Sequence, residues 1–426
     1  MLTLILFFCC CVFLILSILF FPKLKIGKLS LSTFWLVPLF FAILMVIFRS
    51  VSLKDLKDSF FSDSDINPLK ILILFLSMTG LSVFLDELGF FSFLAQWFAL
   101  RFNQNQYVLF IALYLLISVL TVFTSNDIII LTFTPFLIYF CRRNQIDAIP
   151  YLIMEFVAAN TYSMFFIIGN PTNIYLSSAC HLSFLGYFKV MWLPTLLSGI
   201  TSFAILFLMF HKKLKEKLHP SNEVSPHLKK VPLMVGICLL LLTTLLLAIS
   251  NYLNLEMYLI SSSAFLILLV FAVFYSVYEK ENYVLPLLRK LPWTLVPFVL
   301  SMFVLVIGMK KTDFYSGMKD FLLSFDTTFS YGIFSAISAN IINNIPMAVF
   351  FEGLLDSSDI KAVYATIIAS NLSAYLTPMG ALAGIMFSNL CKSHGIKMNY
   401  MTFLRYSLPV GIPTLAVALL VLRFLV

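Results

Sequence analysis

Stretches of about twenty apolar residues recur along the chain and constrain its fold more than any other feature. A helix of that length crosses the hydrocarbon core of a bilayer. Leu2–Phe21 contains no charge, follows no basic residue and precedes no small-residue cleavage site. We therefore expect it to be retained as a first helix rather than removed as a signal peptide. Comparable stretches are Leu31–Phe48, Ile71–Leu85, Val190–Phe210, Val231–Leu255, Met257–Tyr278, Leu291–Met309 and Tyr406–Leu422.

The composition supports a lipid environment. Of the 426 residues, 61% are hydrophobic and 11% are charged, whereas a soluble domain is nearer half apolar and a quarter charged. The formal charge of +8 does not indicate nucleic acid, because the basic residues lie in loops and no nucleic-acid motif is present. The composition predicts a multi-pass protein of the inner or plasma membrane, with the lipid bilayer as its surroundings.

Four further apolar segments are interrupted near their middle by polar, Gly or Pro residues, and each is too long for one span. They are Tyr107–Cys141, Phe156–Cys180, Thr327–Phe351 and Ala362–Cys391. A break at membrane depth is tolerated only where it is buried in protein or lines a cavity. We therefore expect re-entrant hairpins over 107–141 and 327–351, and broken helices over 150–180 and 362–391.

The distribution of Lys and Arg sets the expected topology. We assume that each hairpin enters and leaves the membrane on the same face. The following loops then all lie on one side of the membrane: 22–30, 101–105, 141–150, 211–230, 279–290 and 392–405. These loops carry 18 of the 28 basic residues, which places them in the cytoplasm and both termini outside. The expected organisation is an N-terminal half over 1–210, a cytoplasmic linker over 211–230 and a C-terminal half over 231–426. The fold class is thus all-α, with about ten transmembrane helices and two hairpins.

The two halves contain short matches in the same order. Leu76-Ser77-Met78 recurs 224 residues later as Leu300-Ser301-Met302, and Ser125-Asn126 aligns with Asn343-Asn344 at an offset of 218. Asn160 and Gly169 align with Asn371 and Gly380 at an offset of 211. Coincidence in a Leu- and Phe-rich chain is the alternative. With a cytoplasmic linker and an odd number of spans per half, the repeats would be inverted, which is typical of secondary transporters.

The breaks supply the candidate site. Side-chain amides and hydroxyls at the hairpin tips can coordinate a hard cation or bind a polar solute; the alternative is that they only cap short helices. The Gly- and Pro-containing breaks leave helix N-termini with unpaired N–H groups, or are packing kinks. The candidate residues are Ser125, Asn126, Asp127, Asn160, Gly169, Asn170, Thr172, Asn173, Asn343, Asn344, Asn371, Thr377 and Gly380. A sodium ion is expected, if present, at Ser125, Asn126, Asn343 and Asn344.

Asp127 is the one acidic residue within the broken tips. Ionisable residues inside membranes are functional candidates, so we expect Asp127 to couple transport to sodium or protons; capping the following helix is the alternative. Glu155 lies near a helix start, where an acid suits the helix dipole, and is assigned a structural role.

No enzymatic motif is present. All five histidines fall in loops, and the chain has no HExxH, nucleophile elbow or P-loop. The seven cysteines have no metal-ligand spacing. We expect a non-enzyme without a cofactor, driven by an ion or voltage gradient or by a separate ATPase subunit. A homodimer is left open.

The breaks resemble those of the ion transporter superfamily, and within it the arsenite permease and anion permease group, which includes citrate-transporter-like proteins. The motifs that carry the resemblance are Phe123-Thr124-Ser125-Asn126-Asp127, Ile168-Gly169-Asn170-Pro171-Thr172-Asn173, Ile342-Asn343-Asn344-Ile345-Pro346, Leu376-Thr377-Pro378-Met379-Gly380-Ala381-Leu382-Ala383 and Gly395-Ile396-Lys397. The resemblance implies that the hairpins and broken helices surround the substrate and coupling-ion sites. This sequence departs from the pattern at Ile128, Ile129 and Ala381.

The resemblance implies an ion-coupled carrier of a small anion or oxyacid, and we place efflux of arsenite or antimonite first. A sodium-coupled di- or tricarboxylate symporter and a sodium/proton antiporter are the alternatives. No Lys or Arg lies within the four interrupted segments, which favours a neutral or cationic solute. An ion channel, from another class, would instead show a polar pore stripe or a filter loop.

Overall fold

The computed structural model describes the chain except for residues 22, 27–28, 62–66, 102–104 and 218–228, so most of the expected linker lies outside the described residues. The first half contains α1 (Leu2–Phe20), β1 (Lys23–Ile26), β2 (Leu29–Ser32), α2 (Thr33–Ile47), α3 (Leu53–Phe61), α4 (Pro68–Glu87), α5 (Phe90–Arg101), α6 (Gln106–Phe123), α7 (Asn126–Arg143), α8 (Ile149–Tyr162), η1 (Ile167–Gly169), α9 (Pro171–Ala179) and α10 (Phe184–Phe210).

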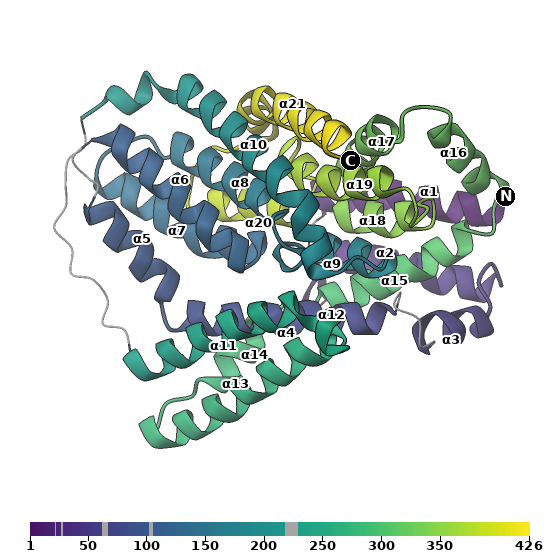
Figure 1. Ribbon diagram of the computed structural model, residues 1–426, viewed down its shortest axis with the longest axis horizontal. Helices are drawn as coiled ribbons and strands as arrows, with labels where there is room; N and C mark the ends of the chain where they lie inside the picture. The colour runs from purple at the N-terminus through teal and green to yellow at the C-terminus, as the bar shows by residue number, and fades with distance from the viewer. Residues whose placement is uncertain (22, 27–28, 62–66, 102–104, 218–228) are drawn as a thin grey trace.

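The rest of the chain repeats, from α15 onward, the order of elements seen from α4 to α10. It contains η2 (Lys213–Lys215), α11 (Lys230–Ala248), α12 (Ser250–Leu253), α13 (Met257–Glu279), α14 (Val284–Lys290), α15 (Leu295–Met309), α16 (Asp313–Leu323), α17 (Thr327–Ile342), α18 (Asn344–Glu352), α19 (Ile360–Leu372), η3 (Ser373–Tyr375), α20 (Leu382–Ser393) and α21 (Tyr400–Leu425). The run from α4 to α10 and the run from α15 to α21 follow the same pattern, including a 3-10 turn before the second arm of each broken helix. Figure 1 shows how the helices of both runs are arranged.

The predicted all-α, polytopic class is confirmed. Seven helical segments of the described chain are long and apolar enough to cross a membrane, namely α4, α6, α10, α11, α13, α14–α15 and α21, and α1 and α2 are shorter apolar helices. One local difference is a two-stranded antiparallel hairpin of β1 and β2 where the sequence suggested a loop. Its strands read Lys-Leu-Lys-Ile and Leu-Ser-Leu-Ser, and this polar–apolar alternation favours strands over a helix.

Helices α4 and α15 run in opposite directions through the molecule. The end of α4 lies beside the segment that leads into α15, because Lys290 pairs with Glu87 at 2.5 Å. At the other end, Lys311 follows α15 and pairs at 2.5 Å with Asp55, which precedes α4. Each of these two helices packs against a helix from the other half of the chain: α2 packs on α15, and α13 packs on α4.

The hairpin α6–α7 opens at one end of the molecule. Gln106, at the start of α6, donates to the Glu216 carbonyl at 2.8 Å, and Asp147, just after α7, pairs with Lys213. Tyr107 also donates to the carbonyl of His211, at the end of α10. Helix α6 therefore begins, and helix α7 ends, close to the end of α10.

The hairpin α17–α18 opens at the opposite end. Tyr331, in the second turn of α17, donates to the Leu354 carbonyl just after α18, at 2.7 Å. Asp326, before α17, pairs at 2.6 Å with Arg423 at the end of α21. Helix α21 begins where α10 ends, since the rings of Tyr406 and Phe210 lie 5.3 Å apart. The two hairpins thus enter from opposite ends, as an inverted arrangement requires.

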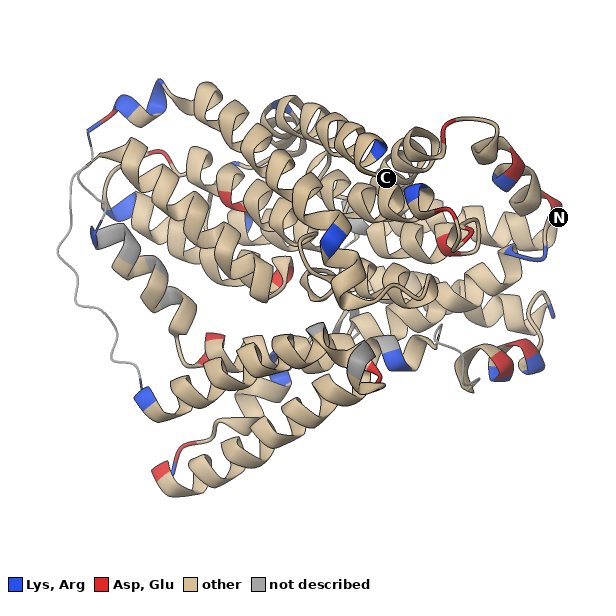
Figure 2. Ribbon diagram, viewed as in Figure 1, with Lys and Arg blue, Asp and Glu red and all other residues tan. Residues whose placement is uncertain are grey.

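Most charged residues lie toward the two ends of the helices, with few between them (Figure 2). At the end with the opening of α6–α7, Arg142 donates to the His394 carbonyl and Lys229 pairs with Glu281 at 2.7 Å. These contacts join loops that the Lys and Arg count assigns to one face. The opposite end carries α3 and α16, and both chain termini lie toward it (Figure 1).

Candidate substrate and ion site

The first hairpin tip is an extended break between two helices. Thr124 and Ser125 leave the helical conformation, and Asn126 begins α7. The Asn126 side chain donates to Asn160 Oδ1 of α8 at 2.9 Å. Ser125 Oγ and Asn126 Oδ1 are buried without a hydrogen-bond partner. Buried polar atoms are normally paired, so this tip presents two oxygens for a ligand.

The second tip is sharper and better anchored. Asn343 adopts a φ of +77°, a region in which Asn is more tolerated than most residues. Its side chain donates to the Met379 carbonyl at 3.1 Å. The backbone N–H of Asn344 donates to the Gly380 carbonyl at 2.9 Å, and its side chain donates to the Ser370 carbonyl at 3.2 Å. Asn340 Oδ1, in α17 near the tip, is buried without a partner.

The two broken helices meet in an asparagine cluster, which consists of Asn170, Asn173, Asn371 and Ser163. Asn371 Oδ1 accepts from Ser163 Oγ at 2.9 Å and from Asn170 Nδ2 at 3.1 Å. Asn371 Nδ2 donates to Asn173 Oδ1 at 2.6 Å. All four side chains are almost inaccessible. Residues from both halves of the chain are therefore joined at the centre of the molecule.

Thr172 extends the cluster. Its hydroxyl lies 2.9 Å from Ser370 Oγ and 2.9 Å from Asn170 Oδ1. Thr377 lies apart from this group: its hydroxyl accepts from the Met379 N–H at 3.3 Å and so shapes the loop before α20. Among the described hydrogen bonds, the hairpin tips connect to each other through the broken helices rather than directly. The sodium site expected at Ser125, Asn126, Asn343 and Asn344 stays a prediction.

Gly169 and Gly380 occupy equivalent tight positions. A Cβ atom on Gly169 would lie 2.1 Å from the Ser163 carbonyl oxygen, and one on Gly380 would lie 2.5 Å from the Ser373 carbonyl oxygen. Neither approach is possible for a larger residue without a backbone shift. Each glycine therefore lets the chain fold back on its own broken helix and brings the second arm against the first.

Asp127 does not join the asparagine cluster but lines a cavity, here called the α7–α20 cavity, of about 240 Å³. Helices α2, α4, α7 and α20 and the segment around α14 surround it. Its polar lining residues are Ser32, Thr33, Thr79, Ser125, Asp127, Lys290, Thr294 and Asn389. The cavity runs from the first tip toward the end of the molecule where Lys290 pairs with Asp86 and Glu87.

Sequence reasoning missed Thr79, Lys290 and Asn389 as lining residues. Thr79 directly follows the repeated Leu-Ser-Met triplet, which could have indicated it. Lys290 and Asn389 lie in segments far from Asp127 along the chain, so no local pattern identifies them.

Glu155 is fully buried on α8, and Thr134 of α7 donates to both of its carboxylate oxygens at 2.9 and 3.0 Å.

The unpaired atoms at the first tip are oxygens, from the Ser125 hydroxyl and the Asn126 amide. No group of three or more His, Cys, Asp or Glu side chains capable of holding a metal ion occurs among the described residues. Hydroxyl and amide oxygens at the tips are suited to a hard monovalent cation rather than a transition metal.

A model of the citrate transporter family matches residues 29–357 of the sequence, which include both hairpins and three residues of the asparagine cluster, namely Ser163, Asn170 and Asn173. The chain belongs to the citrate transporter family. It is similar to a putative arsenical pump membrane protein of Bacillus subtilis, with 24% identity covering 87% of this chain and 89% of the relative. It is also similar to an arsenical pump membrane protein of Escherichia coli strain K12, with 26% identity covering 81% and 84%.

A third relative is a 46 kDa membrane protein of Mycobacterium leprae, with 22% identity covering 87% of this chain and 90% of the relative. This citrate transporter family member is a multi-pass plasma membrane protein, as its apolar helices indicate. The predicted membership of the arsenite and anion permease group is confirmed by the family match and these relatives.

Proposed function

We propose that this protein is an ion-coupled secondary transporter that exports a small oxyacid, with arsenite as the first candidate. The observation that carries the proposal is a pair of candidate access routes related by the repeat, one wide and one narrow. Alternating exposure of a fixed site by two inverted repeats is how many secondary transporters work.

The wide route is the α7–α20 cavity, which reaches Ser125 at the first tip. The repeat relates α7 to α18 and α20 to α9. Those two helices line a narrow seam, here called the α9–α18 seam, with a volume of about 20 Å³. Thr172 lies at the buried end of this seam, and its wall includes Tyr175 and Phe303, whose rings meet edge to face at 5.0 Å.

Helices α4 and α15 form the wall common to both routes. Phe75 and Leu295 line the cavity as well as the seam. Movement of the hairpins and broken helices against this wall would close one route and open the other. A channel would instead need both routes open together.

The charge of the α7–α20 cavity favours a neutral solute. Lys290 is the only basic residue among its lining residues, and it is held by Asp86 at 3.2 Å and Glu87 at 2.5 Å. A tricarboxylate would have to compete with those two carboxylates. Arsenious acid is uncharged at neutral pH and carries hydroxyls that Ser125, Thr79 and Asn389 could bind. The names of the relatives agree with this choice.

The second candidate is a sodium-coupled di- or tricarboxylate symporter, which the description of the matching family favours. In either case Asp127 would carry the coupling. A low-dielectric environment favours the neutral form of a carboxyl group, and a bound cation favours the ionised form, so Asp127 could exchange a proton for sodium. Energy from a separate ATPase subunit is a further possibility that reconstitution distinguishes.

The test is transport into proteoliposomes that contain the purified protein and no ATP. Radiolabelled arsenite and citrate are offered with an imposed proton or sodium gradient. We expect arsenite accumulation that depends on the gradient; citrate accumulation would support the symporter, and arsenite movement only with ATP and a partner would contradict the secondary mechanism. Asn126→Ala and Asn344→Ala should weaken apparent affinity about ten- to hundredfold, whereas Asn105→Ala, at the exposed start of α6, should not.

A further inference from the structure

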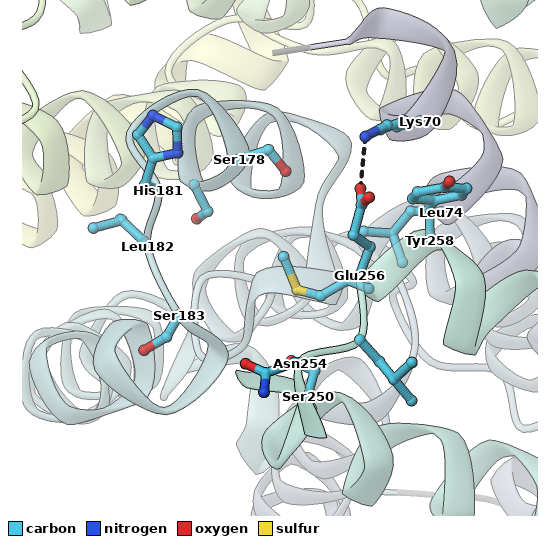
Figure 3. Close-up of a pocket in the computed structure, with 13 residues that line it drawn as sticks. Lys70, Leu74, Ser178, His181, Leu182, Ser183, Ser250, Asn254, Glu256 and Tyr258 are labelled. Atoms are coloured by element: carbon cyan, nitrogen blue, oxygen red, sulfur yellow. Dashed lines mark hydrogen bonds and ion pairs between the residues drawn. The ribbon is translucent and has the colours of Figure 1, made fainter. Parts of the chain in front are cut away.

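A second polar pocket, of about 420 Å³, lies at the end of the molecule opposite the mouth of the α7–α20 cavity. Figure 3 shows the residues that line it. It is enclosed by the start of α4, the connection from α9 to α10 and the connection from α12 to α13, and we call it the α9–α13 pocket. Lys70, which lines it, is in the first turn of α4, whereas the other cavity lies near the last turn. Its volume is within the range of small-molecule sites.

One of the residues that line the pocket carries a buried, unpaired hydroxyl. Ser177 lines the pocket, its residue is 0% exposed, and its Oγ has no hydrogen-bond partner. A buried hydroxyl without a partner is costly unless a ligand or water completes it. Ser388, which the repeat places at the equivalent position of α20, also has a buried Oγ without a partner. The same unpaired group thus occurs on both second arms.

Helix α9 connects Ser177 to the asparagine cluster. Ser177 follows Asn173 by four residues, so the two side chains lie on one face of the helix, about 6 Å apart along its axis. Asn173 Oδ1 accepts from Asn371 in the cluster. A solute at Ser177 would therefore be one turn of α9 away from Asn173 and the asparagine cluster.

The lining of the pocket selects against strongly charged solutes. The ammonium group of Lys70, a lining residue, is paired with Glu256 at 2.8 Å and lies 5.5 Å from the centre of the Tyr258 ring. Figure 3 shows this pair at one side, with Ser178 and His181 on another. Serine hydroxyls and the Asn254 amide supply donors and acceptors without net charge. Such a lining suits a small neutral molecule that carries several hydroxyls.

We propose that the α9–α13 pocket is a second binding site for a small, neutral, polyhydroxylated oxyacid, on the opposite side of the asparagine cluster from the α7–α20 cavity. Ser177 binds the solute there and passes it between the pocket and Asn173. This inference rests on the proposed function for the identity of the solute, but the pocket and its unpaired hydroxyl do not depend on that function.

Arsenite is the probe, and Ser177→Ala is the test variant. Ser198→Ala is a matched control, because Ser198 is also fully buried with an unpaired hydroxyl but does not line the pocket. Binding of radiolabelled arsenite to the purified proteins is measured by equilibrium dialysis, and all variants keep the seven cysteines, so thiol binding is common to them. Half-saturation of transport is measured in membrane vesicles of each orientation.

We expect Ser177→Ala to weaken binding and to raise half-saturation from the pocket side about fivefold to tenfold, from the loss of one hydrogen bond. Half-saturation from the other side and all values for Ser198→Ala should stay unchanged. The pocket proposal is wrong if the natural protein transports arsenite and Ser177→Ala shows the same half-saturation from both sides. It is also wrong if Ser177→Ala and Ser198→Ala weaken arsenite binding to the same extent. Arsenite binding that depends on Ser177 without transport would overturn the proposed function alone, and neither binding nor transport would overturn both.

Discussion

Replacing Asn371 with alanine should destabilise the protein and abolish transport, because Asn371 joins the two halves. The change removes the partner of Asn170 Nδ2 and of Asn173 Oδ1, for which no other hydrogen bond to a described residue is present. Ser163 Oγ keeps its bond to the Asn160 carbonyl at 2.9 Å. Each buried polar group left unpaired costs about 1–3 kcal/mol, so the two together predict about 2–6 kcal/mol.

The assay is the free energy of unfolding of purified protein in mixed micelles under increasing denaturant, compared with Asn105→Ala. Asn105 accepts the Tyr107 N–H at the exposed start of α6 at 2.8 Å, and loss of such a cap costs about 0.5–2 kcal/mol. A double-mutant cycle of Asn371→Ala with Asn170→Ala should show a coupling of at least about 0.5 kcal/mol. If Asn371→Ala unfolds like the natural protein and the cycle is additive, the asparagine cluster does not hold the halves together.

Three further changes test other parts of the structure. Gly169→Ala should cost about 1–3 kcal/mol or more, because its Cβ meets a backbone oxygen at 2.1 Å, whereas Gly317→Ala, with nothing within 4 Å, should be neutral or slightly stabilising in the same unfolding assay. Asp127→Asn should retain solute exchange across proteoliposomes but lose gradient-driven accumulation and its pH response; accumulation with the natural pH profile would rule out coupling through this residue. Hydrogen bonds from Lys311 and Ser52 hold the pKa of Asp55 well below its usual range. The stability that this interaction contributes is present above the unfolded pKa of about 3.9 and lost as the pH falls further, so the difference between natural protein and Asp55→Asn should shrink below about pH 4, and a pH-independent difference would contradict it.

The sequence alone determined the class of fold and the places where it is interrupted. Apolar runs that match the thickness of a bilayer specify helices locally, without reference to distant partners. Breaks at Ser125, Gly169, Asn343 and Gly380 are also local, because Gly, Pro and Asn disturb helices wherever they occur. In the structure these four residues lie between consecutive α-helices.

Only the tertiary structure decided how those interruptions meet. That Asn371 contacts Asn170 and Asn173, about two hundred residues away, follows from the crossing of α8–α9 and α19–α20. Asp127, the neighbour of Asn126 in sequence, turns instead into a cavity shared with Asn389, because successive residues on a helix point in different directions. The wide cavity, the narrow seam and the pocket at Ser177 depend on how whole helices pack, and packing between distant segments leaves no periodic signal in the sequence.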